Sequence, residues 1–388
     1  MNTYRKAGSH VRGIALALAV ALAPALAGAQ TAVLGNFQQV YVYPQISFPA
    51  GSCPATVPVN TVTGGAGSSH GVGFYGSDFA LVSYFSSSQI RNIQLSTGTV
   101  LNTISTSGIG YSGTGTIAVA PSLSHALAAT GGSVFVFQAP FTAPTQSSVP
   151  LPGSVAGYQT QAIVFNAASR AFISHSGGIS VMDPPYTSVA FTIPGDFEAV
   201  AISPDGNTLL ATNLNAQLGI INGPFSAAST TSFLTISGAA LDGITVTPDG
   251  SRALAVSASG TSPLYSIASP FTTSSPVEVI PFPAGLGSFE DISVSSDGLY
   301  ALATGNNGTN LGLMRAPFTT AGATSCQIPV TGGRGAGAVR FLPPGLQPPP
   351  PPPPNPNIIV PTNTPAGLAV MALLLAMLGA FGLRRLRR

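Results

Sequence analysis

Three acidic residues precede three copies of a turn sequence by the same interval. Glu198, Asp242 and Glu290 each lie seven residues before the aspartate of an Asp-Gly pair. Carboxylates that converge from three repeats could bind Ca²⁺, which prefers oxygen ligands. The alternative is that they are solvated loop residues that merely repeat with the sequence. We favour this second interpretation, so the sequence predicts no cofactor, with Ca²⁺ as the alternative.

Two glycine-rich patterns match known sites but lie in an unsuitable context. GSSHG, residues 67–71, fits the Gly-x-Ser-x-Gly pattern of a serine nucleophile, which needs a helix directly after the serine. No helical periodicity surrounds it. GIGYSG, residues 108–113, fits a dinucleotide-binding pattern, but we expect a strand and not a helix to follow it. Neither pattern predicts a site.

The histidines do not have metal-ligand spacing. His70, His125 and His175 are widely separated, and we expect the last two in or beside strands, as hydrogen-bonded structural residues. No acid and base pair completes a hydrolase site. Whether the protein is an enzyme stays open, and the sequence favours a protein that is not.

The turn sequence recurs at intervals typical of propeller blades. Asp205, Asp249 and Asp297 are 44 and 48 residues apart, and each lies between two short apolar segments. Periods in the forties with several short strands predict blades of four strands. A second marker runs in step, as APFT at Ala139, DPPY at Asp183, GPFS at Gly223, SPFT at Ser269 and APFT at Ala316.

The two ends of this region complete each other. Residues 334–343 predict a lone first strand, and residues 31–60 predict second, third and fourth strands without a first. Joined, they would form a seventh blade and leave no open edge in the ring. The predicted fold is therefore all-β, a seven-bladed β-propeller over residues 30–343, with a two-sheet or solenoid body as the alternative. In this fold the three acids would start the innermost strands and face the mouth of the central channel.

The turn around Asp205 reads Ser-Pro-Asp-Gly, residues 203–206. Hairpins with this turn resemble those of bacterial extracellular propellers of the YVTN and lactonase-like group. The resemblance spans roughly residues 70–343. It implies a metal at the channel mouth, as in the lactonase-like members that bind one there. The absence of Trp argues against WD40 blades, sialidase Asp-boxes and quinone-dependent dehydrogenase propellers.

Both ends of the chain carry targeting signals. A basic segment precedes an apolar run that ends in Ala27 and Ala29, the pattern of a secretory signal peptide over residues 1–29. Residues 344–357 form a proline-rich linker, in which seven consecutive prolines favour a stiff polyproline II spacer. Residues 358–388 form the sorting segment, in which the uncharged stretch of 18 residues from Ala366 to Leu383 is long enough to span a membrane as one helix. A cluster of arginines follows and would hold the tail in the cytoplasm, namely Arg384, Arg385, Arg387 and Arg388.

The C-terminal end resembles the protein-sorting signals of Gram-negative bacteria that are named after an Ile-Pro-Thr-Leu motif. Val360, Pro361 and Thr362 match the start of the motif, and Asn363 stands in place of the leucine. The resemblance covers about the last thirty residues. It implies export, anchoring in the inner membrane facing the periplasm, processing by an exosortase-like sorting protease, and delivery to the cell surface or medium.

Charge narrows the choice of partner. Without its two ends the chain keeps six Lys and Arg residues against 11 Asp and Glu, a net charge of about −5. A nucleic-acid surface needs a basic stripe, so we expect no nucleic-acid partner. The sequence predicts a surface-displayed propeller that binds an unknown envelope, matrix or host ligand. The alternatives are a lactonase-like metal hydrolase that uses the channel acids and a structural matrix subunit.

Cys53 and Cys326 are the two cysteines of a chain that we expect in an oxidising compartment, where a lone pair is usually bonded. Each precedes the fourth strand of its blade. Equivalent positions on neighbouring blades splay apart, whereas a disulfide tolerates about 7 Å between Cα atoms. Long turns before both cysteines could close this gap, so we favour a disulfide that ties the N-terminal strands to the end of the ring.

Overall fold

The structure is a computed structural model. It describes residues 30–36, 39–46, 60–62, 69–84, 87, 89–106, 116–130, 132–142, 148–154, 162–259, 263–283, 286–305, 310–330, 336–343 and 346. The signal peptide, the proline-rich linker and the sorting segment predicted above lie outside these residues.

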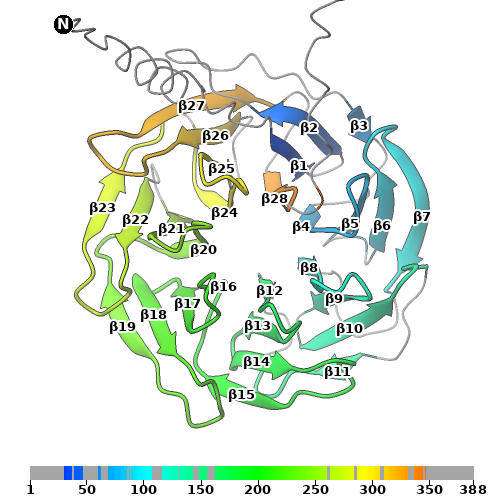
Figure 1. The fold of residues 1–388 in the computed structure, drawn as a ribbon, viewed down its shortest axis with the longest axis horizontal. Helices are drawn as coiled ribbons and strands as arrows, with labels where there is room; N and C mark the ends of the chain where they lie inside the picture. Colours follow the sequence, from blue (N-terminus) through cyan, green and yellow to red (C-terminus); the bar gives the residue numbers. More distant parts are fainter. Residues whose placement is uncertain are drawn as a thin grey trace, which may run out of the picture. The chain divides into compact units, whose positions relative to one another are not determined.

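The described strands form seven four-stranded antiparallel sheets, arranged in a ring around a central axis (Figure 1). The sequence prediction of a seven-bladed propeller is thus confirmed, and the two-sheet and solenoid alternatives are wrong. Within the described ranges, no helix is long and apolar enough to cross a membrane. The helix expected at residues 366–383 lies outside them.

Six blades are each built from four consecutive strands, with the first innermost and the fourth outermost (Figure 1). We number them 1 to 6 in chain order. Blades 1 to 3 contain β4 (Ser69–Phe74), β5 (Phe79–Tyr84), β6 (Gln89–Gln94), β7 (Thr99–Ser105); β8 (Thr116–Val119), β9 (His125–Thr130), β10 (Ser133–Gln138), β11 (Val149–Pro150); β12 (Ile163–Phe165), β13 (Ala171–His175), β14 (Gly178–Met182) and β15 (Phe191–Pro194). Blades 4 to 6 contain β16 (Val200–Ile202), β17 (Thr208–Asn213), β18 (Gln217–Asn222), β19 (Ser232–Thr235); β20 (Leu241–Val246), β21 (Arg252–Ser257), β22 (Leu264–Ala268), β23 (Val277–Ile280); β24 (Phe289–Val294), β25 (Tyr300–Gly305), β26 (Asn310–Arg315) and β27 (Thr324–Pro329).

The seventh sheet joins both ends of the ring and is called the composite blade here. Its order is β28 (Ala336–Phe341), β1 (Gln30–Asn36), β2 (Val40–Ile46) and β3 (Asn60–Val62). The innermost strand comes from the C-terminal side, and it pairs with β1 in a register that sets Leu34 opposite Val339. The predicted closure by strands from both ends is therefore confirmed. The fourth strand begins at Asn60, where the predicted one ends.

The Asp-Gly turns link the first and second strands of blades 4 to 6 by the same hydrogen bonds. In blade 4 the carboxylate of Asp205 accepts the backbone N–H of Asn207 at 3.1 Å, and the Ser203 hydroxyl accepts that of Thr208 at 2.9 Å. The Ser203 hydroxyl in turn donates to Asp205. Gly206 has φ of +73°, a left-handed conformation that costs glycine little. The aspartate stabilises the turn and is not part of the channel.

The second marker, called the Pro-Phe marker here although blade 3 has Pro-Tyr, joins blades 2 and 3 to the blades before them. Phe141, after the third strand of blade 2, packs edge-on against Tyr75 of blade 1, with ring centroids 4.9 Å apart. Tyr186, in the same place in blade 3, packs edge-on against His125 of blade 2 at 5.4 Å. Phe141 is 1% exposed and Tyr186 is fully buried. The marker is therefore a contact between blades, a role that the sequence pattern did not reveal.

Hydrogen bonds reinforce the same contact in the later blades. The backbone carbonyl of Phe318 in blade 6 accepts the Ser266 hydroxyl of blade 5 at 2.7 Å. Two residues further on, the N–H of Thr320 donates to the carboxylate of Glu278 in blade 5 at 2.8 Å. Aromatic burial and polar contacts thus act together at the outer junctions of the ring.

Candidate acidic site at the central channel

The innermost strands of blades 3 to 6 line a cavity of about 320 Å³. Its wall comes mainly from β12, β16, β20 and β24, and it also includes His70 and Arg340. Because innermost strands of a propeller converge on the axis, residues far apart in the chain meet here. Of the acids, Glu290 and Asp291 line this cavity, whereas Glu198 and Asp242 are not part of its wall.

Hydroxyl groups of second strands hold the acid-bearing segments side by side. The Ser174 hydroxyl of blade 3 donates to the backbone carbonyl of Glu198 in blade 4 at 2.8 Å. The Thr212 hydroxyl of blade 4 accepts the N–H of Ala199 at 3.1 Å and donates to the backbone carbonyl of Asp242 in blade 5. One side chain therefore fixes Asp242 beside the segment that carries Glu198.

Gly243 allows blade 5 to pack closely against blade 6. A Cβ on Gly243 would lie 2.8 Å from the backbone oxygen of Glu290 and 2.9 Å from the Cα of Asp291, closer than real Cβ contacts allow. Blades 5 and 6 can approach this closely only because the residue after Asp242 has no side chain. The structure thus brings the three predicted acids onto adjoining segments of blades 4 to 6, and it adds Asp291 to them.

Two of the three predicted acids are buried. Glu198 is 7% exposed and Asp242 is 6% exposed, whereas Glu290 is half-buried and lines the cavity. The expectation of solvated loop side chains is therefore wrong for Glu198 and Asp242, because the neighbouring blades cover them. The Oδ1 atom of Asp242 has no hydrogen-bond partner among the described residues. A buried carboxyl oxygen without a donor is costly to keep ionised.

Electrostatics acts on Asp242 in the same direction as burial. Burial raises the pKa of the Asp242 carboxyl well above its usual range, and the negative charges of Glu198, Glu290 and Asp291 raise it further. Asp242 can therefore carry a proton at a pH where ordinary carboxyl groups are ionised. A neutral acid beside carboxylates can donate a hydrogen bond, give up a proton, or take up a cation in the proton's place.

We expect Asp242→Asn to stabilise the protein at neutral pH and to flatten its pH dependence. A folded-state pKa above the unfolded value means that the folded protein holds more protons between the two values, so stability falls as pH rises through that window. Asparagine resembles the protonated acid and does not ionise. The expected gain is about 1–3 kcal/mol at pH 7, the usual cost of a buried unpaired polar group, and it should vanish below the ordinary aspartate pKa.

Urea unfolding at a series of pH values measures this effect. Asp196→Asn is the matched control, because Asp196 is an exposed acid two residues before Glu198. The control should shift stability little. An Asp242→Asn variant that keeps the pH dependence of the parent would contradict the raised pKa.

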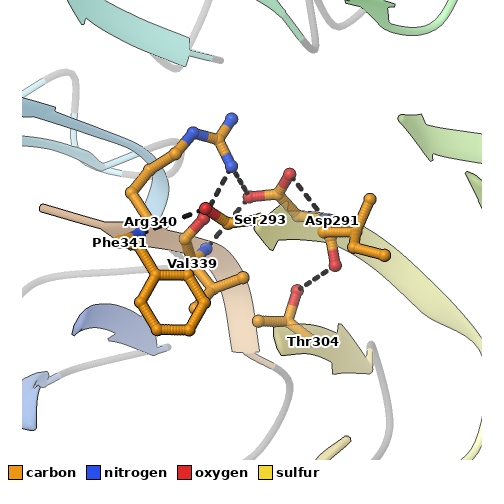
Figure 2. A network of polar contacts seen from close by, with 7 residues as sticks. Asp291, Ser293, Thr304, Val339, Arg340 and Phe341 are labelled. Carbon is orange, nitrogen blue, oxygen red and sulfur yellow. Dashed lines mark hydrogen bonds and ion pairs between the residues drawn. The ribbon is translucent and has the colours of Figure 1, made fainter. Parts of the chain in front are cut away.

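The fourth acid, Asp291, anchors the closing strand (Figure 2). Its Oδ2 atom accepts from the guanidinium of Arg340 and from the N–H of Val339, the latter at 2.9 Å. The neighbouring Ser293 hydroxyl accepts the N–H of Phe341 at 3.1 Å. Arg340 also donates to the carbonyl of Val339 at 2.7 Å. The first strand of blade 6 and the innermost strand of the composite blade are thus joined at the channel wall.

Sequence reasoning missed this ion pair. Asp291 was visible only as the neighbour of Glu290, and Arg340 as part of a lone predicted strand. The available signal was the scarcity of charge. Between its two ends the chain has only six basic residues, and Arg340 is one of them. Because Arg340 lies in the innermost strand beside the channel, its charge needs an acidic partner there.

The residues predicted as candidate Ca²⁺ ligands are Glu198, Asp242 and Glu290. No group of three or more His, Cys, Asp or Glu residues in the described part of the chain is arranged to hold a metal ion. Ca²⁺ binding at Glu198, Asp242 and Glu290 therefore stays a hypothesis, and the resemblance to lactonase-like propellers is what it rests on.

The histidines divide into one at the channel and two within blades. His70 lines the cavity, and burial lowers its pKa to about 4, so it is neutral at physiological pH. His175 is fully buried; its Nδ1 accepts the N–H of Gly177 at 3.0 Å, and its Nε2 lies 2.8 Å from the Ser180 hydroxyl. His125 packs under Tyr186. The expected structural role of His125 and His175 is confirmed.

The two glycine-rich patterns have different outcomes. Ser69, the central residue of GSSHG, lies in strand β4, and the chain continues as a strand after it. The helix that a nucleophile needs at this point is therefore absent from residues 69–84, as predicted. GIGYSG lies outside the described residues.

Cys326 lies in β27, is 1% exposed and takes part in a disulfide. Cys53 lies outside the described residues, so the pairing of the two stays a prediction. We expect non-reducing peptide mapping of the exported protein to recover one peptide pair joined through Cys53 and Cys326, which separates on reduction. Two alkylatable thiols in protein from the periplasm would contradict it and leave ring closure to strand pairing alone.

Comparison with known proteins supports the fold. No family model and no curated protein matches the chain. It is similar to the crystal structure of a putative 6-phosphogluconolactonase from Bacteroides uniformis, with 16% identity, a TM-score of 0.64, and coverage of 81% of this chain and 100% of that one. A putative 6-phosphogluconolactonase from Bacteroides fragilis gives 13% identity, a TM-score of 0.62 and coverage of 81% and 98%. A protein from Lactobacillus plantarum gives 15% identity, a TM-score of 0.62, and coverage of 81% of this chain and 99% of that one. At these identities the similarity shows the propeller fold alone.

Proposed function

We propose that the protein is an exported β-propeller that binds an envelope, matrix or host ligand at its central channel and does not transform it. The observation that carries this proposal is the cavity of about 320 Å³, whose wall includes the half-buried acids Glu290 and Asp291. Cavities of a few hundred Å³ with a few placed polar groups are typical ligand sites. Export and anchoring rest on the signal peptide and on the sorting segment with its Val360, Pro361 and Thr362.

A lactonase-like hydrolase is the second candidate, favoured by one specific observation. Asp242 has a raised pKa next to Glu198 and Glu290, which gives a proton donor beside possible general bases. Two of the similar solved structures are described as putative 6-phosphogluconolactonases. Both candidates place the ligand at the same acids, so only turnover separates them.

The deciding experiment has two arms. First, protein recovered from the cell surface and from the medium is analysed by intact mass, which reports cleavage before Gln30 and any loss of the C-terminal anchor. Second, the same protein is incubated with 6-phosphogluconolactone, simple lactones and phosphoesters, with and without Ca²⁺. We expect an exported species and no turnover. Hydrolysis that disappears in Glu198→Gln would overturn the binding proposal in favour of the hydrolase.

A further inference from the structure

The inner strands of blades 3 to 5 present their backbone edges to the cavity. β12, β16 and β20 are each the first strand of their sheet, so each has a neighbouring strand on one side only. The cavity wall takes four consecutive residues from each of these blades, namely residues 162–165, 199–202 and 243–246. Side chains of a strand alternate between its two faces, so an uninterrupted run of this kind means that the edge of the strand lies along the cavity.

Hydrogen bonds within the sheets show which backbone groups point toward the channel. In blade 4 the N–H of Ser203 donates to the carbonyl of Thr208 at 2.9 Å, across the hairpin. Antiparallel pairing alternates along a strand, so the preceding residue, Ile202, directs its own N–H and C=O away from β17 and toward the axis. The same bond recurs in blades 3 and 5, which places the backbone groups of Phe165 and Val246 in the same orientation.

Phe165, Ile202 and Val246 occupy the same place in three successive blades, at the end of the first strand. All three are half-buried and line the cavity. Each of their peptide groups offers a donor and an acceptor, and such groups need a partner or water. The wall therefore presents donors and acceptors side by side from three directions. A ligand that matches it has to carry both kinds of group around its rim.

The charged groups of the wall disfavour an anionic ligand. Glu290, Asp291 and Arg340 line the cavity, and Arg340 is already paired with Asp291. His70, which also lines it, is neutral at physiological pH because burial lowers its pKa to about 4. Placing like charges together across an interface is costly. A phosphate or carboxylate group in the cavity would therefore meet the charge of Glu290 without a cation to offset it.

Hydroxyl groups suit this wall better than a peptide backbone does. A hydroxyl both donates and accepts, and a sugar ring carries several of them in different directions. An extended peptide pairs along the edge of one strand, whereas the free backbone groups here come from three. The cavity volume of about 320 Å³ is at the small end of ligand sites, which fits a single sugar unit.

We propose that the channel binds an uncharged sugar unit, such as the end of a neutral polysaccharide of the envelope or matrix, through the backbone edges of β12, β16 and β20, with the Glu290 carboxylate accepting from one of its hydroxyls. This inference rests on the proposed binding function and names the class of its ligand. The wall favours such a sugar over a phosphorylated one, because its carboxylates accept from hydroxyls and repel phosphate.

Saturation-transfer NMR on the full exported protein at neutral pH tests the proposal. The probes are glucose, galactose, mannose, N-acetylglucosamine, maltotriose and triacetylchitotriose, with 6-phosphogluconate, butylamine and a capped tetra-alanine peptide as comparisons. We expect transfer to at least one neutral sugar and to none of the comparisons. Glu290→Gln should weaken that sugar by about fivefold or more, the loss of one charge-assisted hydrogen bond.

A pair of matched variants places the sugar in the cavity. Thr245 is half-buried and lines the wall, so Thr245→Tyr should fill the cavity and weaken binding by about tenfold or more. Thr235→Tyr makes the same change at an exposed residue of the outermost strand of blade 4 and should leave the affinity unchanged. Urea unfolding shows whether each variant is folded. If Thr245→Tyr does not fold, Glu290→Gln, which adds no volume, decides the outcome.

Each other outcome overturns the proposal in a recognisable way. A neutral sugar that binds the parent and the folded channel variants equally would lie outside the channel. Binding of 6-phosphogluconate or butylamine instead of the neutral sugars would reject the uncharged ligand but keep the channel as a site. Binding of the peptide instead would assign the free edges to strand pairing with a protein. Transfer to none of the neutral sugars would reject this ligand class alone, since export and turnover are measured separately. Turnover of a lactone would reject the binding function itself.

Discussion

Replacing Tyr186 with alanine is expected to lower the free energy of unfolding by about 3–5 kcal/mol, the usual range for a buried aromatic side chain. Tyr186 is fully buried, and its ring packs edge-on against His125 at 5.4 Å and against Phe165 at 6.0 Å. Its hydroxyl donates to the carbonyl of Ser169 at 2.6 Å. Alanine would leave a cavity at the junction of blades 2 and 3 and free this carbonyl.

Two further variants separate the contributions of packing and hydrogen bonding to this loss of stability. Tyr186→Phe keeps the ring and loses only the hydrogen bond, so we expect a loss of about 1 kcal/mol. Phe271→Ala changes the same marker position in blade 5, where the ring is only half-buried, and should cost less than Tyr186→Ala. Chemical unfolding followed by far-ultraviolet circular dichroism gives all three values. Equal losses in Tyr186→Ala and Tyr186→Phe would show that the hydrogen bond, and not packing between blades, is what the marker provides.

Replacing Arg340 with methionine is expected to cost about 2–4 kcal/mol, because it leaves Asp291 without its cation beside Glu290 and Asp242. Breaking a fully buried ion pair costs about 3–5 kcal/mol, and this pair is partly exposed, with side-chain exposures of 32% and 16%. The same change loosens β28, which Asp291 and Ser293 hold through the N–H groups of Val339 and Phe341. We therefore expect an opening of the composite blade before the rest of the ring.

Hydrogen exchange and urea unfolding measure the two parts of this prediction. Arg170→Met is the control, since its pair with Asp183 is a more exposed one, at 35% and 45%, and should contribute at most about 1 kcal/mol. Arg340→Met combined with Asp291→Asn should recover part of the loss, because the uncompensated charge disappears. If the double variant is as unstable as the sum of the two single variants, the pair does not act as a unit.

The aspartates of the turns and those of the channel show how far a repeat can be interpreted from sequence. An acid recurs with equal regularity at the turn position of Asp205 and at the channel position of Asp242. The carboxylate of Asp205 accepts an N–H two residues away and stabilises a turn at the surface. Asp242 is buried against a neighbouring blade, through a hydroxyl that lies thirty residues before it. Regular spacing along the chain indicates that a residue has the same position in each blade. It does not indicate whether a neighbouring blade buries that residue.

The blades and the closed ring can be predicted from the amino-acid sequence alone. Alternation of short apolar strands with turns is a local property, and a period in the forties over residues 30–343 leaves room for seven such units. The complementary strand sets at residues 31–60 and 334–343 determined the closure. The sequence pattern does not show that Glu198 and Asp242 are buried, that Asp291 pairs with Arg340, or that the Pro-Phe marker joins blades. Each of these depends on contacts between neighbouring blades, whose geometry follows from packing around the axis and leaves no period in the chain.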